Sequence, residues 1–136
     1  MIPEEFVTAA DARKHFADTY GKESYKAKKE YGVTIYSYIN SKGIRVYSYN
    51  LVRVGKGTGG TFCPQQQMEL PKGYYVKCVI HTHAGYSYEK DYSKADKTAS
   101  NNMGVDWYLL LDNGEILPAY KPNTWEEPLY NEYNLK

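Results

Sequence analysis

Two histidines one residue apart stand out in this chain of 136 residues, at the end of the segment Val79-Ile80-His81-Thr82-His83. Side chains on a β-strand alternate between its two faces, so both imidazoles project from the same side and can bind one ion. Asp96 follows after a short loop, at the start of a predicted helix, and can supply a third ligand. Three protein ligands leave a coordination position open for water, as in catalytic zinc sites. The spacing therefore predicts a metal-dependent hydrolase.

The same residue types also have ordinary structural roles. A His-x-His pair on a strand can consist of two polar side chains that face solvent. Ser93 and Asp96 have the spacing of a capping box, which satisfies amides at a helix start whatever the function. The metal site is favoured because the histidines end a strand and Ser93 begins the next helix, so both open onto one edge of a sheet. Glu89 and Asp91, in the loop between them, either face solvent or replace a ligand.

An N-terminal helix is predicted over residues 3–20, inside a segment 1–21. Pro3 suits the first turn, Glu4 complements the positive end of the helix dipole, and Gly21 suits a left-handed stop. The Lys-rich segment 22–29 is expected to continue as a short, solvated helix. His15 lies off the apolar stripe and is expected to be an ordinary surface histidine.

The rest of the chain alternates β-patterns with turn signals. Expected are a hairpin (33–39 and 44–49), a loop (54–60), strands (61–66 and 74–81), a helix (93–103), a hairpin around Asp112-Asn-Gly114 (105–111 and 115–120) and an irregular extension (121–136). Together they predict one α/β domain over 1–136, with a mixed, mostly antiparallel sheet flanked by helices.

Composition limits the functional classes. The formal net charge of +1 disfavours nucleic-acid binding, which usually shows a basic excess. The chain has no apolar run of 18 residues and no leader of the secretory type, so no membrane span is expected. Of its two cysteines, Cys78 is expected to be a buried free thiol, with a Cys63–Cys78 disulfide as the alternative.

Three segments together resemble a known family: Glu30-Tyr-Gly-Val-Thr-Ile-Tyr36, His81-Thr-His83 and Tyr92-Ser-Lys-Ala-Asp96. They are similar to the JAB/MPN-type (JAMM) zinc metallopeptidases, whose pattern is a glutamate before a Gly-containing strand, then His-x-His-Pro, then Ser-x-x-Asp. They look still more like JAB-like domains at the C-termini of bacterial polymorphic toxins, including Rhs-type toxins. The likeness runs from the first helix through the 112–114 hairpin.

The resemblance implies a JAB/MPN-like (cytidine-deaminase-like) fold and a role for each residue of the motif. His81, His83 and Asp96 would bind Zn²⁺, Glu30 would be the general base or acid on the activated water, and Ser93 would donate a hydrogen bond to the oxyanion. Two departures stand out: Ala84 replaces the usual proline, and nine residues separate His83 from Ser93, about two more than is common. The longer loop alters the expected cleft and substrate.

The resemblance further implies a toxin effector that hydrolyses an amide or isopeptide bond in a protein or peptide. Such a module would be exported within a larger carrier protein, delivered to a target cell and matched by a cognate immunity protein; otherwise it would be cytoplasmic.

Two other functions remain open. The first is a metal-dependent nuclease, in which Lys26, Lys28, Lys29 and tyrosines contact a nucleic acid strand. The second is a non-enzymatic binding module on the same scaffold, since a fold does not fix a function.

Overall fold

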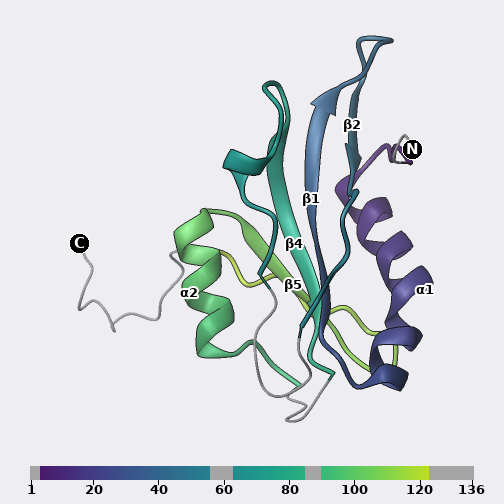
Figure 1. The fold of residues 1–136 in the computed structure, drawn as a ribbon, viewed down its shortest axis with the longest axis vertical. Coiled ribbons are helices and arrows are strands. Elements are labelled where there is room, and N and C mark those ends of the chain that lie inside the picture. The colour runs from purple at the N-terminus through teal and green to yellow at the C-terminus, as the bar shows by residue number, and fades with distance from the viewer. Residues whose placement is uncertain (1–3, 56–62, 85–89, 123–136) are drawn as a thin grey trace.

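The computed structural model describes residues 4–55, 63–84 and 90–122. In chain order the elements are α1 (Ala9–Ala27), β1 (Tyr31–Ile39), β2 (Arg45–Ser48), β3 (Arg53–Val54), the 3-10 helix η1 (Gln67–Glu69), β4 (Tyr75–Thr82), α2 (Lys94–Met103) and β5 (Asp106–Leu110). They form a small α/β domain with two α-helices and a mixed sheet of five strands (Figure 1).

The sheet has the order β2-β1-β4-β5, and β3 pairs with the start of β1. β1 is antiparallel to β2, β3 and β4, whereas β4 and β5 are parallel and are connected through α2. Parallel neighbours need a crossover of this kind, because a tight turn cannot join them. The mixed, mostly antiparallel character expected from the strand patterns is therefore confirmed.

The two helices cover opposite faces of the sheet. On β4, Cys78 and Ile80 pack in the cluster that contains α1, whereas Val79 packs with Ala99 and Met103 of α2. Alternation along the strand explains this division, since neighbouring side chains point to opposite faces. His81 and His83 have the parity of Val79 and so belong to the α2 face.

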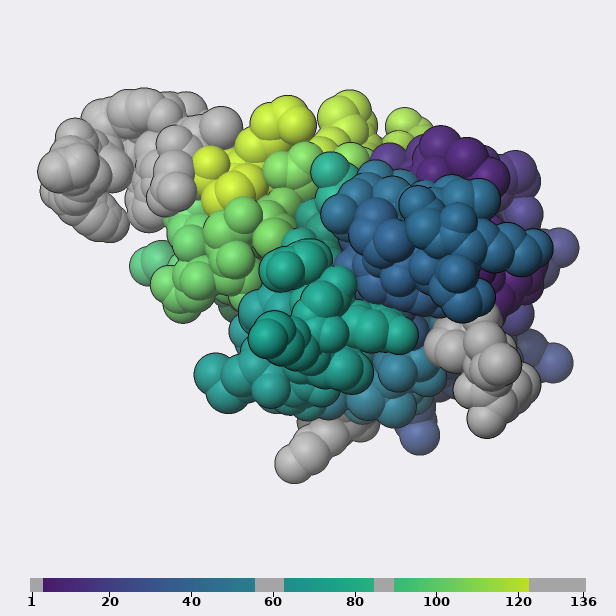
Figure 2. Space-filling model, turned by 90° about the horizontal axis from the view of Figure 1, so that it is seen from above, coloured from purple at the N-terminus to yellow at the C-terminus, as the bar shows by residue number. Residues whose placement is uncertain are grey.

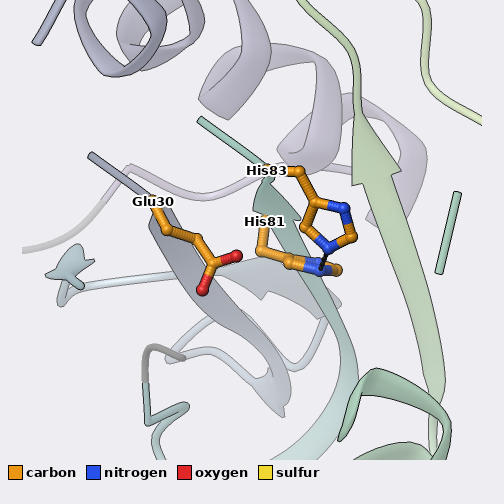
Figure 3. Close-up of side chains that lie close together, drawn as sticks. All are labelled: Glu30, His81 and His83. Atoms are coloured by element: carbon orange, nitrogen blue, oxygen red, sulfur yellow. Dashed lines mark hydrogen bonds between the residues drawn. The ribbon is translucent and has the colours of Figure 1, made fainter. Parts of the chain in front are cut away.

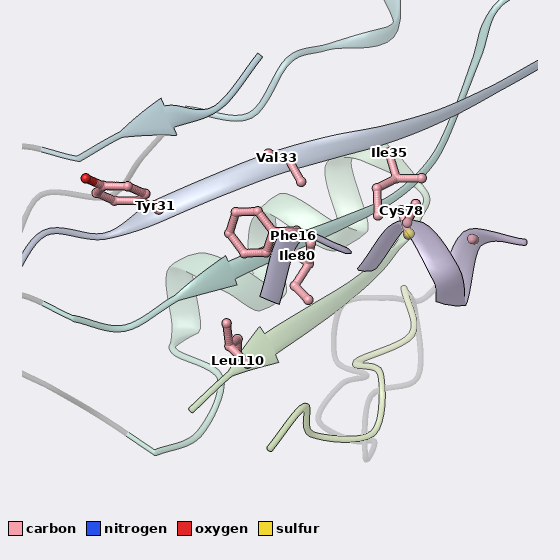
Figure 4. Close-up of a cluster of buried hydrophobic side chains, with 9 residues drawn as sticks. Phe16, Tyr31, Val33, Ile35, Cys78, Ile80 and Leu110 are labelled. Atoms are coloured by element: carbon pink, nitrogen blue, oxygen red, sulfur yellow. The ribbon is translucent and has the colours of Figure 1, made fainter. Parts of the chain in front are cut away.

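The main core lies between α1 and the sheet (Figure 4). Phe16 of α1, Ile35 of β1 and Ile80 of β4 are all fully buried there. Burying a side chain of this size stabilises the fold by about 1.5–3 kcal/mol. This core fixes α1 against the two strands that carry the candidate site.

The N-terminal helix begins and ends later than the sequence predicts. Thr8 is its N-cap and accepts a hydrogen bond from the Asp11 amide at 3.0 Å. Phe6, predicted to be helical, instead exchanges two backbone hydrogen bonds with Tyr47 of β2. The helix prediction is therefore wrong for the described residues 4–8, because Phe6 is held against the edge strand β2.

The prediction that Gly21 ends the helix is wrong, because Gly21 lies inside α1. A Cβ at this position would lie 2.9 Å from Leu110 Cδ2, so the glycine allows α1 to approach β5 closely. The helix continues through most of the Lys-rich segment to Ala27, and its C-cap Lys28 has a left-handed φ of 58°. The Lys-rich segment is thus helical as expected, but as part of α1.

The other elements mostly follow the sequence pattern. The β1–β2 hairpin, β4 and α2 form where expected, and Gly114 (φ 91°) closes a turn between Leu111 and Glu115. Residues 115–120 contribute only isolated bridges from Ile116 and Tyr120 to β5. Neither described helix is long and apolar enough to cross a membrane.

The strand predicted over 61–66 is absent from its described part, 63–66. Pro64 has no amide proton for a strand ladder, and the amide of Gln66, the N-cap of η1, donates instead to the Glu69 carboxylate. The expected loop 54–60 and extension 121–136 lie largely outside the described residues.

Cys63 and Cys78 are both free, so the alternative of a disulfide between them is wrong. Cys63 is exposed, whereas Cys78 is buried in the main core, as expected. Burial raises the pKa of the Cys78 thiol, which disfavours a reactive thiolate.

Candidate metal centre

β4 brings the two histidines to one place. His81 is completely buried in the strand and His83, just beyond its end, is 6% exposed. Their Nε2 atoms lie 3.1 Å apart, and the ring planes meet at 70°. Figure 3 shows both rings on the same side of the sheet. The sequence prediction that these imidazoles converge is confirmed.

Thr82, between the histidines, points to the opposite face and anchors the strand end. Its Oγ1 lies 2.6 Å from Ser24 Oγ of α1 and accepts a hydrogen bond from the Tyr31 amide at 3.0 Å. The Ser24 hydroxyl also lies 2.6 Å from the Lys29 carbonyl oxygen. One buried threonine therefore joins α1, the start of β1 and the end of β4 directly behind the histidines.

Tyr25 of α1 fixes the backbone of His83. Its hydroxyl accepts a hydrogen bond from the His83 amide at 3.2 Å and donates one to the Leu110 carbonyl at 2.5 Å. Because His83 lies past the last residue of β4, this bond replaces part of the support that a strand ladder would give.

Asp96, in the first turn of α2, completes the cluster. Its Oδ1 lies 3.2 Å from His81 Nε2, and its Oδ2 lies 2.8 Å from His83 Nε2. Burial by itself would raise the pKa of Asp96, but its contacts with the two histidines and the hydrogen bond from the Ser93 amide outweigh burial. The pKa of Asp96 is therefore held well below its usual range, and the carboxylate stays ionised.

Ser93 is the N-cap of α2 and forms a reciprocal capping box with Asp96. The Ser93 Oγ accepts from the Asp96 amide at 3.1 Å, and the Ser93 amide donates to Asp96 Oδ2 at 2.9 Å. The structural role that the S-x-x-D spacing indicates is thus present. The capping role is compatible with a role of Ser93 in catalysis, because a hydroxyl that accepts one hydrogen bond can still donate another.

The proton count in this cluster fits a bound cation. His81 Nδ1 lies 2.8 Å from the Tyr108 carbonyl oxygen, which can only accept, so Nδ1 carries the hydrogen. In the neutral ring, Nε2 then presents a lone pair to Asp96 Oδ1, which is also an acceptor. Either a second proton on His81 or a cation is needed between them. A hydrogen bond from the far ring nitrogen to a carbonyl is also the usual support of a metal-binding histidine.

The distances fit a small ion as well. Tetrahedral zinc with bonds near 2.05 Å places its ligand atoms about 3.3 Å apart. The shortest separations are 3.1 Å between the two Nε2 atoms, 3.2 Å from His81 Nε2 to Asp96 Oδ1 and 2.8 Å from His83 Nε2 to Asp96 Oδ2. A slight spreading of the side chains would bring these atoms to bonding geometry.

Glu30 is the fourth member of the site. β1 pairs Gly32 with His81, and Glu30 precedes Gly32 by one strand period, so it emerges on the same face. One Glu30 carboxylate oxygen and one ring nitrogen each of His81 and His83 all lie within 4.8 Å of one another. In Figure 3 the Glu30 carboxylate points toward the imidazoles. Glu30, His81 and His83 thus form a group that could hold a metal, and Asp96 contacts both histidines while its carboxylate accepts from the Ser93 amide.

Two other candidates, Asp91 and His15, do not join the cluster. Asp91 is exposed and accepts a hydrogen bond from the Tyr92 amide, and Glu89 lies outside the described residues. His15 lies 2.7 Å from the Tyr49 hydroxyl, outside the cluster.

Sequence reasoning missed the supporting groups, namely Tyr25, Thr82 and the Tyr108 carbonyl. For Thr82, its position between two inward-facing histidines could have indicated a contact on the opposite face. A backbone carbonyl leaves no signal in the sequence.

Comparison with protein-family models, curated proteins and solved structures finds no match to this chain. The assignment of the fold class and of the side-chain cluster therefore depends on the structure alone.

Proposed function

We propose that this domain is a zinc-dependent hydrolase that cleaves an amide or isopeptide bond. The observation that carries the proposal is the convergence of His81, His83 and Asp96, with the Glu30 carboxylate beside them. Two imidazoles and one carboxylate are ligands that zinc accepts, and three protein ligands are typical of catalytic zinc sites.

Zinc held by these residues would act as a Lewis acid on a water molecule and on the carbonyl group of the substrate. The protein supplies the pre-organised ligands: the Tyr108 carbonyl orients His81, and Tyr25 holds the backbone of His83. Because three of the four side chains are almost fully buried, little of this geometry has to form when substrate binds.

Glu30 is the proton carrier in this proposal. It is more exposed than the three ligands, and it comes from a different strand, so it faces the cluster from one side. Its carboxylate would accept a proton from the attacking water and deliver it to the leaving amine nitrogen. General acid–base assistance of this type is typically worth about 10²–10⁴-fold in rate.

Ser93 is proposed to donate its hydroxyl proton to the substrate carbonyl oxygen as negative charge develops there. Its position at the N-terminus of α2 adds the positive end of the helix dipole to the same region.

The resemblance in sequence supports a biological setting for this activity. Similarity to JAB-like toxin domains favours an effector delivered to a target cell, which acts on a protein or peptide and is neutralised by an immunity protein. These features are proposed from the resemblance alone.

A nuclease is the second candidate. Lys26, Lys28 and Lys29 are exposed at the end of α1, directly before Glu30. Positive charge beside a metal site can bind a phosphate backbone. Binding that weakens steeply with salt would favour this function over peptide hydrolysis.

The decisive experiment replaces Glu30 with Gln. The amide keeps the size of the side chain but cannot take the proton of water, so zinc content and fold should be retained while hydrolysis falls by about 10²–10⁴-fold. Zinc is measured by elemental analysis of protein never exposed to chelator or nickel resin, and hydrolysis with a panel of amide and isopeptide substrates.

Glu4→Gln is the matched control, because Glu4 is exposed and its carboxylate contacts His15 of α1, outside the cluster. It should leave the rate unchanged. Full activity of Glu30→Gln at equal zinc loading would contradict the proposed mechanism.

A further inference from the structure

A second polar cavity lies on the α2 face of the sheet, toward the β1–β2 hairpin. We call it the tyrosine groove; its volume is about 570 Å³, within the range of small-ligand sites. The side chains used below are Glu5, Tyr36, Tyr38, Gln65, Glu69 and Tyr74. Figure 2 shows this end of the molecule, with the hairpin in blue beside the teal segment that precedes β4.

Aromatic rings form one wall of the groove. Tyr38 of β1 and Tyr74, just before β4, are stacked with centroids 4.5 Å apart and planes at 19°. Tyr36 packs against Tyr74 with centroids 5.6 Å apart. Tyr36 and Tyr38 are 2% and 8% exposed, so the half-buried ring of Tyr74 is the π surface that a planar or cationic group could reach.

Two carboxylates, Glu5 and Glu69, are among the polar groups that line the groove. Glu5 accepts hydrogen bonds from the Tyr38 hydroxyl and the Asn40 amide, and these bonds lower its pKa, so it stays ionised. Glu69 is paired with Arg53. None of the described residues that line the groove is a lysine or an arginine. Arg53 offsets the charge of Glu69, so the Glu5 carboxylate is the negative charge that a ligand would meet in the groove.

Gln65 gives an independent indication of a ligand. Its side chain lines the groove and is 9% exposed, yet its buried Oε1 has no hydrogen-bond partner in the described part of the chain. A buried acceptor left unpaired costs about 1–3 kcal/mol. A ligand that donates a hydrogen bond here would remove that cost.

The groove and the metal centre share one face of β1. The Gln65 carbonyl accepts a hydrogen bond from Thr34, which lies one strand period, about 7 Å, from Gly32 opposite His81. Thr34 is 1% exposed, so packed residues separate the groove from the metal centre.

We propose that the tyrosine groove binds a cationic side chain of a peptide, with arginine as the best fit. A guanidinium group stacks on a tyrosine ring and donates several hydrogen bonds in one plane, toward Glu5 and Gln65. The inference concerns binding alone and does not depend on hydrolysis at the metal centre.

The test uses three blocked tripeptides, Gly-X-Gly, in which X is arginine, citrulline or norleucine. Binding is followed by NMR shifts of the tyrosine rings in the metal-free protein, which separates it from activity. Arginine should bind at least about tenfold tighter than citrulline, which has a similar shape but no charge, and norleucine should not bind. Equal affinity of arginine and citrulline, or tighter binding of a neutral oligosaccharide, would overturn the proposal.

Two variants locate the site. Glu5→Gln should weaken arginine binding by about tenfold, and Glu115→Gln, at the far turn, should not. Gln65→Met removes the unpaired oxygen, so it should weaken binding while the melting temperature stays equal or rises. Unchanged affinity in both Glu5→Gln and Gln65→Met would show that the peptide binds elsewhere.

Discussion

At the scale of single residues, Ser93 and Asp96 perform two tasks with the same atoms. The Asp96 carboxylate accepts from the Ser93 amide and also contacts both histidines. A change at either residue therefore affects helix stability and the site together, and an experiment must separate the two effects.

Ser93→Ala makes that separation. Loss of the cap should cost about 0.5–2 kcal/mol of unfolding free energy, since the Asp96 amide loses its acceptor. If the hydroxyl also stabilises the oxyanion, turnover should fall by about 10²–10³-fold. Denaturant unfolding and steady-state kinetics measure the two quantities on the same preparation.

Thr8→Ala is the matched control, because Thr8 caps α1 in the same manner, far along the chain from the site. It should show the stability loss alone. A Ser93→Ala variant that behaves like Thr8→Ala, with turnover preserved, would leave Ser93 a purely structural cap.

The residues of the site were predictable where their types and periodicity carry the information. His81 and His83 share a face because of strand alternation, and S-x-x-D spacing fixes Asp96 beside Ser93. The second ring hydrogen bond of His81 was not predictable, because it goes to a main-chain carbonyl that any residue could supply.

At the scale of elements, the contact between α1 and β5 depends on Gly21. Replacement by Ala gains up to about 1 kcal/mol of helix propensity, but the new Cβ would lie 2.9 Å from Leu110 Cδ2. Leu110 is 1% exposed and has little room to move, and overpacking typically costs about 1–3 kcal/mol. We expect a net loss of about 1 kcal/mol in the unfolding free energy of Gly21→Ala.

Lys22→Ala serves as the control, since Lys22 is exposed on the next position of the same helix. It should change stability by less than about 0.5 kcal/mol. A stabilised Gly21→Ala variant would mean that helix propensity, and not the contact with Leu110, decides this position.

The boundaries of α1 show why the ends of helices and strands are difficult to predict from sequence. A glycine at position 21 is typical of a helix end, but here it allows close packing against Leu110. The C-cap is Lys28, in a left-handed conformation that lysine seldom adopts. Likewise Pro3 and Glu4 suggest a helix start, although the following Phe6 pairs with β2. In each case a distant part of the chain overrides the local preference.

At the scale of the whole molecule, zinc should stabilise the fold. An ion bound only by the native state at 100 times its Kd adds about 2.7 kcal/mol, which raises the Tm of a domain of this size by about 10 °C. Thermal unfolding followed by circular dichroism, with zinc and with excess chelator, measures this shift.

The double variant His81→Ala/His83→Ala should lose the zinc-dependent part of the shift and the zinc stoichiometry. Retention of one zinc per chain by the double variant would mean that the ion binds elsewhere. Asp96→Ala should show a smaller loss, because water can take the vacant position.

The whole architecture was predictable only in part. Alternating patterns and turn signals gave the mixed sheet and the two helices, but not the placement of β4 between β1 and β5. Strand order depends on which faces fit together over long sequence separations, and local patterns do not encode it.

The central position of β4 has a kinetic consequence. Its amides are hydrogen-bonded to strands on both sides, so they should exchange with solvent deuterium only when the whole molecule unfolds. α2 packs on the sheet through a smaller cluster, with Ala99 and Met103 only partly buried, and its amides should exchange through local opening. The imidazoles would then keep their positions, while the Asp96 carboxylate would move away from them when α2 opens and move back when α2 closes. Release of the ion would follow the opening rate of α2, and measured exchange and metal-release rates should agree.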